Sequence, residues 1–268
     1  MPDTHRLEPD QKIDLKAITT KGKQLHKDRA AAEAEFRQLR SELVELQSRL
    51  YAERRQRLLV VFQAMDAGGK DGTIRRVFQG VNPQGVRVAS FKAPSQLELS
   101  HDFLWRIHQR TPAAGMISVF NRSHYEDVLI VRVDRLVPKS VWLARYEQIN
   151  DFERMLADNG TTILKFYLHI SKQEQKERFQ ERLDDPQKHW KFAMKDLDKR
   201  KQWDEYQQAY EAMLNRCTSD HAPWYVIPSD QKWYRNLAIS RVIVHTLRRL
   251  NPQFPPAEAG IEGTKIED

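Results

Sequence analysis

The sequence predicts an α/β fold in which a parallel β-sheet lies between layers of helices. Short, almost uninterrupted apolar runs recur along the chain, and each is typical of a strand that is buried on both faces. Segments with helical spacing of apolar residues separate these runs. Because strands that alternate with helices form parallel sheets with right-handed crossovers, we expect a ligand site at the carboxyl ends of the strands.

The predicted elements follow one another in a regular order. Residues 25–57 carry helix formers with apolar residues at three- and four-residue steps, which indicates a long amphipathic helix or a helix pair that covers one face of the sheet. A coiled-coil arm is the less favoured alternative. The remaining expected elements are strands at 57–65, 86–91, 116–121, 162–170 and 224–228, and helical segments at 95–110, 144–160, 171–216 and about 233–250.

Composition limits the class of protein and its partners. The chain has 268 residues, of which 40% are apolar and 30% charged, and no run of about 18 apolar residues that would span a membrane. A single cysteine, Cys217, cannot form an internal disulfide, and the N-terminus lacks a secretion signal, so we expect a cytoplasmic protein. The net charge of +7 favours anionic partners: nucleic acid, an anionic membrane or a phosphate-rich molecule.

A glycine-rich turn, QAMDAGGKDGTI at residues 63–74, follows the first predicted strand. The phosphate-binding (Walker A) pattern is G-x-x-x-x-G-K-[ST]. Gly69 and Lys70 match it, whereas Ala64 replaces the first glycine and Asp71 replaces the Ser or Thr that holds magnesium. A strand before the turn and a helix after it favour a phosphate site over an ordinary turn, with the helix N-terminus and the lysine directed at the anion.

Two carboxylates, Asp66 and Asp71, are unusual in such a turn. A carboxylate repels bound phosphate unless a divalent cation lies between them, and Mg²⁺ favours one or two carboxylates together with phosphate oxygens. Asp66 is the preferred candidate for this ligand, or for a base that acts on the attacking oxygen. Asp71 could equally be the acidic first-turn residue of the following helix.

A second polar cluster follows the strand at 116–121. Asn121 and Arg122 end this strand, and a run that contains Glu126 and Asp127 comes next. Phosphate-loop enzymes commonly carry an acidic metal site on the neighbouring strand, and arginine suits bidentate binding of phosphate oxygens. The alternative is that Glu126 or Asp127 merely caps a helix.

Taken together, these motifs resemble the polyphosphate kinase 2 family over roughly residues 10–250. The segments that carry the resemblance are QAMDAGGKDGTI, GVNPQGVRVASFKAPS, HDFLWRIHQRTP, FNRSHYEDVLIVRV, RFQERLDDPQKHWKFAMKDLDKRKQWDEYQQAY and APWYVIP. The resemblance implies a three-layer P-loop kinase-like core with a helical lid, and reversible phosphoryl transfer between inorganic polyphosphate and nucleotides. It implies Mg²⁺ as cofactor, with Mn²⁺ as an alternative, adenine or guanine nucleotides as substrates, and a homo-oligomer.

The resemblance also implies a division of the chain and roles for individual residues. An N-terminal extension (1–24) precedes a single catalytic domain (25–250) whose lid spans about 171–205, and a flexible tail (251–268) follows. The catalytic candidates are Asp66, Lys70, Arg122 and Asp127, of which Asp66 and Asp127 would hold the metal. The phosphate- and nucleotide-binding candidates are Ala67, Gly68, Gly69, Lys70, Asp71, Gly72, Thr73, Lys92, Arg122, Glu126, Arg178, Arg182, Lys188 and Arg200.

Substrate choice and rival functions complete the expectations. FNRSHYED looks like the subgroup that phosphorylates both AMP and ADP, because members restricted to diphosphates tend to carry Asn at the position of Glu126. One rival is an ATP-dependent kinase for a nucleotide or another small acceptor, with the same loop and fold. A nucleic-acid-binding protein explains the basic charge but leaves the loop and the second cluster without a role, so we expect neither nucleic-acid nor membrane partners.

Overall fold

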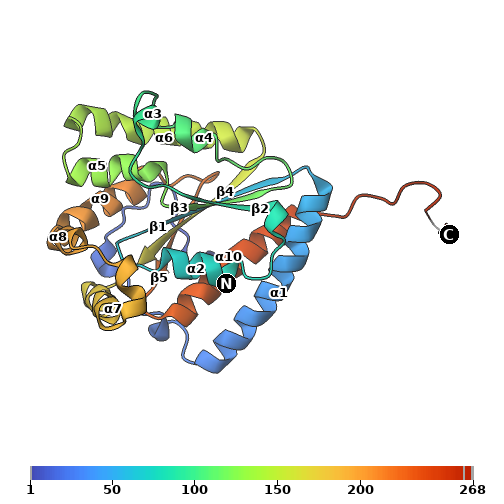
Figure 1. The fold of residues 1–268 in the computed structure, drawn as a ribbon, viewed down its shortest axis with the longest axis horizontal. Coiled ribbons are helices and arrows are strands. Elements are labelled where there is room, and N and C mark those ends of the chain that lie inside the picture. The colour runs from blue at the N-terminus through green and yellow to red at the C-terminus, as the bar shows by residue number, and fades with distance from the viewer. Residues whose placement is uncertain (1, 262, 267–268) are drawn as a thin grey trace.

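The centre of the computed structural model, which describes residues 2–261 and 263–266, is a parallel five-stranded sheet (Figure 1). Its spatial order is β2-β3-β1-β4-β5, so β1 lies in the middle with β3 and β4 on either side. The predicted α/β fold and the predicted adjacency of the strands before the two polar clusters are confirmed. The strands are β1 (Arg57–Ala64), β2 (Val86–Ser90), β3 (Ile117–Asn121), β4 (Thr161–His169) and β5 (Trp224–Pro228).

Helices cover both faces of the sheet and form separate cores with it. On one face α1, α2 and α10 pack against β1, β4 and β5, and on the other face α6 and α9 pack together with residues near the N-terminus (Figure 1). The α-helices are α1 (Arg29–Glu53), α2 (Lys70–Val77), α3 (Gln96–Leu99), α4 (Trp105–His108), α5 (Ile130–Val133), α6 (Lys139–Asp158), α7 (Lys172–Asp184), α8 (Lys195–Lys201), α9 (Trp203–Arg216) and α10 (Lys232–Leu250).

The segment predicted as a helix or helix pair at 25–57 is one packing helix, α1. It begins after Asp28, whose carboxylate accepts a hydrogen bond from the Ala31 amide, and it ends at Arg54 in the left-handed conformation. Its apolar stripe lies against α10, and bidentate Arg241–Glu35 and Arg248–Glu42 ion pairs border that contact.

The single helical segment predicted at 95–110 is instead two short helices, α3 and α4. Ser95 caps the first with a capping box. Asp102 then accepts hydrogen bonds from the amides of Leu104 and Trp105, which starts the second helix. The prediction of helical structure in this segment was therefore right, but it missed the capping residue that divides the segment into two helices.

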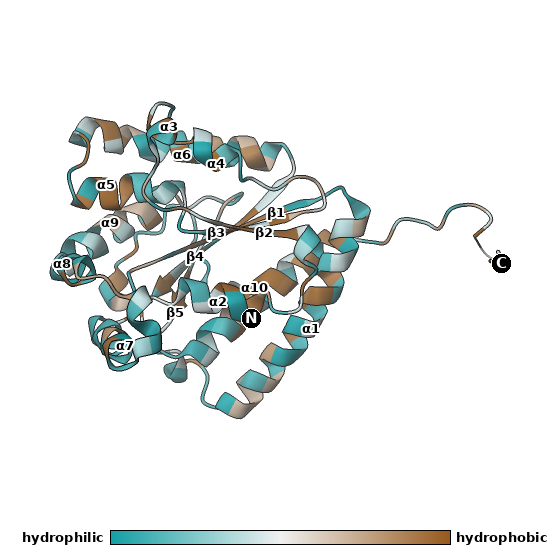
Figure 2. Ribbon diagram, viewed as in Figure 1, coloured by the Kyte–Doolittle hydropathy of each residue, from teal (hydrophilic) through white to brown (hydrophobic). Residues whose placement is uncertain are grey.

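The charged insertion at 171–216 is helical as predicted and contains α7, α8 and α9. Figure 2 shows α7 and α8 largely in hydrophilic colours, whereas α10 carries hydrophobic segments among hydrophilic ones. This difference agrees with the positions of the helices, because α10 fills a core and α8 has no buried residue. Together α7, the 3₁₀ helix at Pro186–Lys191 and α8 make up most of the segment that was predicted to be a lid.

The two ends of the chain differ in how they pack. Within the predicted N-terminal extension, Leu7, Ile13 and Leu15 are buried in the core beside α9, and the Leu7 amide donates to the Trp224 carbonyl. The C-terminal segment runs away from the body (Figure 1); positions 1, 262, 267 and 268 of the predicted termini lie outside the described residues. None of the helices among the described residues is long and apolar enough to cross a membrane.

Candidate active site

A tight turn, which we call the glycine loop (residues 65–69), connects the end of β1 with the start of α2. The Gly68 amide donates to the Met65 carbonyl at 2.9 Å, and both Ala67 and Gly69 have positive φ angles of 59° and 99°. Helix α2 begins immediately after Gly69, and the amides of its first turn lack intrahelical acceptors. These amides and the positive end of the helix make the mouth of the loop suitable for an anion.

Lys70 brings a cation to this mouth. Its Nζ donates to the Ala64 carbonyl at 2.9 Å, so the side chain folds back over the loop. Burial, followed by the charge of Arg122, lowers the pKa of Lys70 to about 8, although the carboxylates of Asp66, Glu126 and Asp71 oppose this shift. Lys70 therefore stands in a dense group of charges.

Arg122 enters the same group from β3. It has a positive φ of 61°, and its amide donates to the Phe62 carbonyl of β1 at 3.1 Å. Its Nη2 lies 3.2 Å from Asp66 Oδ1, which joins the two polar clusters predicted from the sequence. Burial alone would lower the pKa of Arg122, but the negative charges of Glu126 and Asp66 outweigh burial and raise it.

Asp71 links the start of α2 to the end of β3. It accepts a hydrogen bond from Asn121 Nδ2 at 2.5 Å, and it lies in the first turn of the helix. A carboxylate at that position stabilises the helix dipole, which agrees with the simpler of its two predicted roles. The side-chain amide of Gln63 lies between Ser123 and Glu126. Its nitrogen and oxygen atoms lie 3.1 Å from Glu126 Oε1 and Ser123 Oγ, which connects β1 with the turn after β3.

Asp127 occupies a different environment from Glu126. It is largely buried, and its Oδ1 accepts a hydrogen bond from Arg145 Nη1 at 2.9 Å. Burial raises the pKa of Asp127 to about 6, although the neighbouring arginines Arg145 and Arg106 counteract the rise. Asp127 is therefore held by an internal ion pair, whereas Glu126 shares its surroundings with Asp66, Lys70 and Arg122.

The carboxylates of the site suit a metal ion that is bound partly by the protein and partly by the phosphate groups of the substrate. Among the described residues, no group of three or more His, Cys, Asp or Glu side chains could hold a metal ion without help. Mg²⁺ usually takes only one or two carboxylates and completes its shell with water and phosphate oxygens. Asp66 fits this role, because its side chain is half-buried and only Oδ1 faces Arg122. Asp127 fits less well, because Arg145 already neutralises it.

The predicted phosphate-facing residues elsewhere make mostly internal contacts. Thr73 is buried and donates to the Gly69 carbonyl, and Lys92 is exposed on a loop after β2. Arg178 lies beneath the glycine loop, with 6% of its side chain exposed, and donates to the Ala67 carbonyl at 2.9 Å. The three other insertion cations that were predicted to face phosphate contact their own segment: Arg182 donates to the Lys191 carbonyl, Lys188 pairs with Asp185, and Arg200 donates to the Lys172 carbonyl.

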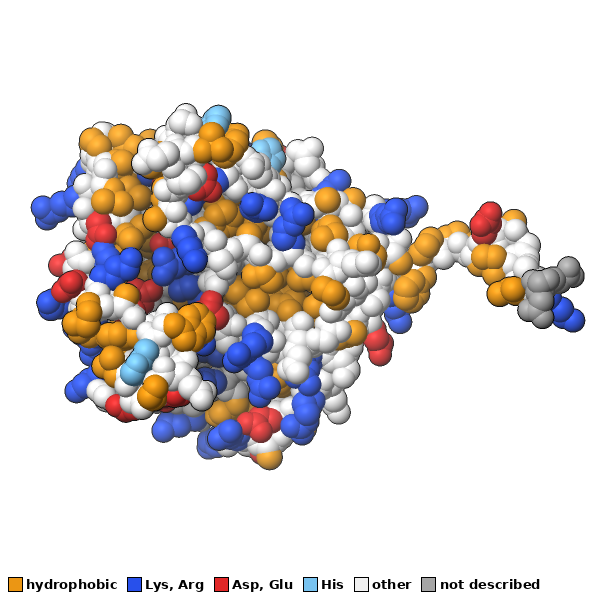
Figure 3. Space-filling model, in the orientation of Figure 1, with side chains coloured by type: hydrophobic (Ala, Val, Ile, Leu, Met, Phe, Trp, Pro, Cys, Tyr) orange, Lys and Arg blue, Asp and Glu red, His pale blue; other side chains and the backbone are white. Residues whose placement is uncertain are grey.

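Basic and acidic side chains gather on the face that holds the site. Figure 3 shows Lys and Arg side chains beside Asp and Glu side chains in the region between α5 and α7. Lys199 of α8 forms an ion pair with Asp134, which follows α5, so the insertion contacts the opposite side of this region. The insertion therefore borders the charged region that holds the site.

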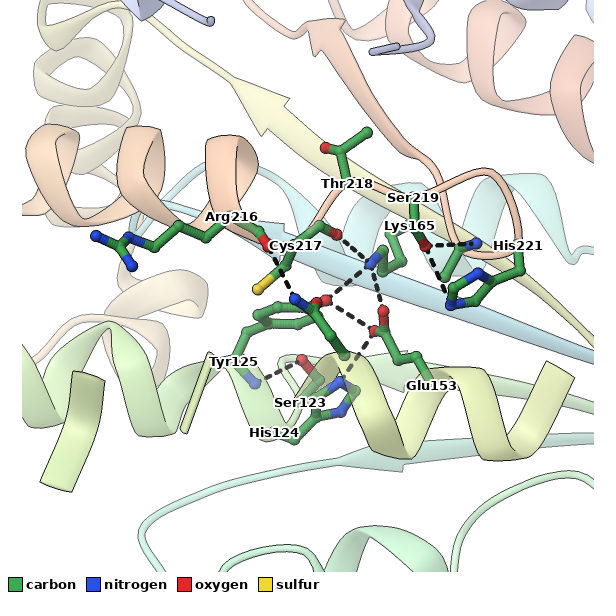
Figure 4. A network of polar contacts seen from close by, with 12 residues as sticks. Ser123, His124, Tyr125, Glu153, Lys165, Arg216, Cys217, Thr218, Ser219 and His221 are labelled. Carbon is green, nitrogen blue, oxygen red and sulfur yellow. Dashed lines mark hydrogen bonds and ion pairs between the residues drawn. The ribbon is translucent and has the colours of Figure 1, made fainter. Parts of the chain in front are cut away.

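A buried network that the sequence did not predict supports the second cluster (Figure 4). Lys165 of β4 and Glu153 of α6 are both fully buried and form an ion pair at 2.5 Å. Lys165 also donates to the Tyr125 hydroxyl at 2.8 Å and to the Cys217 carbonyl at 2.7 Å, which satisfies its three protons. Glu153 accepts hydrogen bonds from Tyr125 at 2.8 Å and from His124 Nε2 at 3.1 Å.

This network fixes the turn that carries the charged residues of the site. Burial alone would raise the pKa of Glu153, but Lys165 and the hydrogen bond from His124 outweigh burial and lower it. His124 and Tyr125 stand directly between Arg122 and Glu126 in the chain, so one carboxylate holds the middle of the turn. In the sequence, the sign of this network was Lys165, a charged residue within the apolar run TILKFYLHI.

Replacing Lys165 with methionine is expected to lower the free energy of unfolding by about 3–5 kcal/mol, because Glu153 would remain buried without its charge partner. Urea denaturation of the variant and the wild type measures the change. The double variant Glu153→Leu/Lys165→Met serves as control, and it should be more stable than the single variant because no buried charge is left unpaired. A double variant that is no more stable than Lys165→Met contradicts a stabilising charge pair.

Three comparisons place this architecture among known proteins. The family model of polyphosphate kinase 2 matches residues 25–255. The chain is 54% identical to the AMP/ADP-polyphosphate phosphotransferase of Meiothermus ruber over 98% of this chain and 99% of that protein. It is 46% identical to the ADP-polyphosphate phosphotransferase of Rhodopseudomonas palustris over 91% and 89% of the two chains. The crystal structure of polyphosphate kinase 2 from Arthrobacter aurescens superposes with a TM-score of 0.93 at 40% identity, covering 97% of this chain and 94% of that one.

Proposed function

The chain belongs to the polyphosphate kinase 2 family, and from this membership we propose that it transfers phosphoryl groups reversibly between inorganic polyphosphate and adenine nucleotides, with both AMP and ADP as acceptors. The observation that carries the proposal is the 54% identity, over nearly the whole of both chains, to an enzyme named for AMP, ADP and polyphosphate. Guanine nucleotides are further candidate acceptors, since a 35% identical relative is named a GDP-polyphosphate phosphotransferase.

The geometry of the site supports phosphoryl transfer. Such a reaction needs little covalent chemistry from the protein, and catalysis depends on positioning and on charge neutralisation. The amides at the start of α2 hold phosphate oxygens, while Lys70 and Arg122 neutralise the charge that develops on the transferred group. Asp66 would hold Mg²⁺, which would supply positive charge to neutralise the phosphate groups.

The direct test is nucleotide analysis after the purified protein has been mixed with Mg²⁺, long-chain polyphosphate and AMP, with no ATP present. We expect ADP to form first and ATP to follow. A reaction without polyphosphate serves as control. If AMP is unchanged while ADP is converted to ATP, the family activity holds but AMP is not an acceptor. If neither nucleotide reacts, an ATP-dependent kinase becomes the better hypothesis.

We expect Glu126→Asn to lower kcat/KM with AMP by about tenfold or more and with ADP by only a few-fold. The carboxylate of Glu126 acts on both Lys70 and Arg122, so its charge lies where the accepting phosphate must approach. Steady-state kinetics with each acceptor at saturating polyphosphate measure the two losses. Glu126→Gln is the matched control, since it removes the charge at constant length. Equal losses with AMP and ADP would reject Glu126 as the discriminating residue.

A further inference from the structure

Two buried guanidinium groups meet directly behind the glycine loop. Arg178 comes from α7 and Arg235 from α10, and their exposed fractions are only 6% and 3%. Burying a charged group costs several kcal/mol unless it is paired and hydrogen-bonded. The partners of each guanidinium group therefore decide whether the cost of burying two like charges side by side is offset.

Arg178 has the partners that burial requires. Its Nε donates to Glu174 Oε1 at 2.8 Å, and its Nη1 donates to the Ala67 carbonyl of the loop at 2.9 Å. Its Nη2 donates to the Ser229 carbonyl at 2.5 Å. Arg178 thus has one carboxylate and well-placed carbonyls, and it ties the insertion to the loop.

Arg235 lacks comparable partners. Its Nη1 donates to the Gly68 carbonyl and its Nη2 to Asn236 Oδ1, both at 3.4 Å, which is at the limit for a hydrogen bond. Its Nε is buried and has no hydrogen-bond partner among the described residues. Burial, followed by the like charge of Arg178, lowers the pKa of Arg235 to about 9, and Glu174 opposes this shift only in part.

The position of Arg235 connects this unbalanced charge with the mouth of the loop. A Cβ atom on Gly69 would lie 2.1 Å from Arg235 Nη1 and 3.4 Å from Arg178 Nη1. The guanidinium groups therefore pack against Gly69, the residue that ends the loop and precedes α2. The charged groups that act on Arg235 are the guanidinium of Arg178 and the carboxylate of Glu174, so among these three described residues positive charge is in excess.

We propose that Arg235 is a positioning residue whose incompletely paired charge stabilises the glycine loop in its phosphate-bound state. An anion at the front of the loop compensates the positive charge behind it, so the cost of burying Arg235 is offset only when phosphate is bound. The inference deepens the proposed function, and it rests on that function for the identity of the anion as a polyphosphate chain. In this way α10 contributes to substrate binding without contacting the substrate.

The experiment compares two variants of similar side-chain length that differ in charge, Arg235→Lys and Arg235→Met. Inorganic tripolyphosphate is the probe, its affinity is measured by titration calorimetry, and the melting temperature is recorded with and without it. We expect Arg235→Met to bind tripolyphosphate at least tenfold more weakly than Arg235→Lys. Without the probe, Arg235→Met should be as stable as the wild type or more stable, since it removes a poorly paired buried charge.

Arg154→Met is the matched control, because Arg154 is exposed on α6 and pairs with Asp151. It loses the same charge far from the loop and should retain wild-type affinity. Equal affinities of Arg235→Lys and Arg235→Met overturn the inference and leave Arg235 with a packing role, while the proposed function stands. If the wild type itself does not bind tripolyphosphate, the proposed function fails and the inference fails with it.

Discussion

Replacing Lys70 with alanine is expected to lower kcat for polyphosphate-driven nucleotide phosphorylation by at least ~100-fold, because the change removes a fixed positive charge from the transferred phosphoryl group. Lys70 is held over the loop by its hydrogen bond to the Ala64 carbonyl, so it needs little rearrangement to reach an anion at the mouth. Initial-rate kinetics with ADP and long-chain polyphosphate measure the effect. Melting temperatures recorded in parallel show whether the variant is folded.

The pH dependence provides a second readout of the same residue. The pKa of Lys70 is lowered to about 8 in the free protein, so its ammonium group is charged below that pH and neutral above it. Because kcat/KM reports the ionisation of the free enzyme, kcat/KM for polyphosphate should fall as the pH rises through about 8. In Lys70→Arg the charge persists, and this alkaline decline should move to higher pH.

A control separates the specific role of Lys70 from the general basic charge of the chain. Arg76 is exposed on the same helix, and Arg76→Ala removes the same charge. We expect this variant to lose less than ~10-fold in kcat/KM, with the change mainly in KM. Near-normal turnover of Lys70→Ala, or equal effects of the two substitutions, would remove Lys70 from the mechanism.

The sequence predicted those parts of the molecule that depend on local pattern. Apolar runs such as LLVVF placed β1 and the other strands within one or two residues, and the glycine loop was found because its residues are consecutive. The polar residues after β1 and β3 were expected to meet because parallel strands end at one edge of the sheet. The contact between Arg122 and Asp66 at 3.2 Å agrees with that expectation.

The parts that were not predicted depend on contacts between distant segments. Arg235 lies 167 positions from Gly68, and no spacing rule connects α10 with the glycine loop. The ion pair between Glu153 and Lys165 joins a helix to a strand. In the sequence Glu153 resembles an ordinary charge of an amphipathic helix, and Lys165 is a single charge in an apolar run. The resemblance implied a substrate-facing role for Arg178, but its hydrogen bond to the Ala67 carbonyl connects α7 with the loop across 111 positions and could not be read from the sequence.

Replacing Arg122 is expected to lower kcat by at least ~100-fold, but the choice of substitute decides what the experiment measures. Arg122 has a φ of 61°, which is strained for every residue with a Cβ atom. Arg122→Ala keeps this strain but loses the guanidinium contact to Asp66, so the backbone can relax when the charge is removed. Arg122→Gly keeps this backbone conformation accessible and removes the guanidinium. Arg122→Lys keeps the charge but loses the bidentate geometry that suits phosphate oxygens.

The pattern across these Arg122 variants distinguishes between charge, geometry and backbone. If the guanidinium neutralises the transferred group, Arg122→Gly should lose at least ~100-fold in kcat and Arg122→Lys distinctly less, with similar melting temperatures. If Arg122 serves mainly to neutralise the charge of Asp66, Arg122→Gly should instead leave kcat nearly unchanged. Near-normal turnover of Arg122→Gly would show that Arg122 neutralises Asp66 and does not act on the transferred group. A backbone change would not explain this result, because glycine adopts the positive φ at this position.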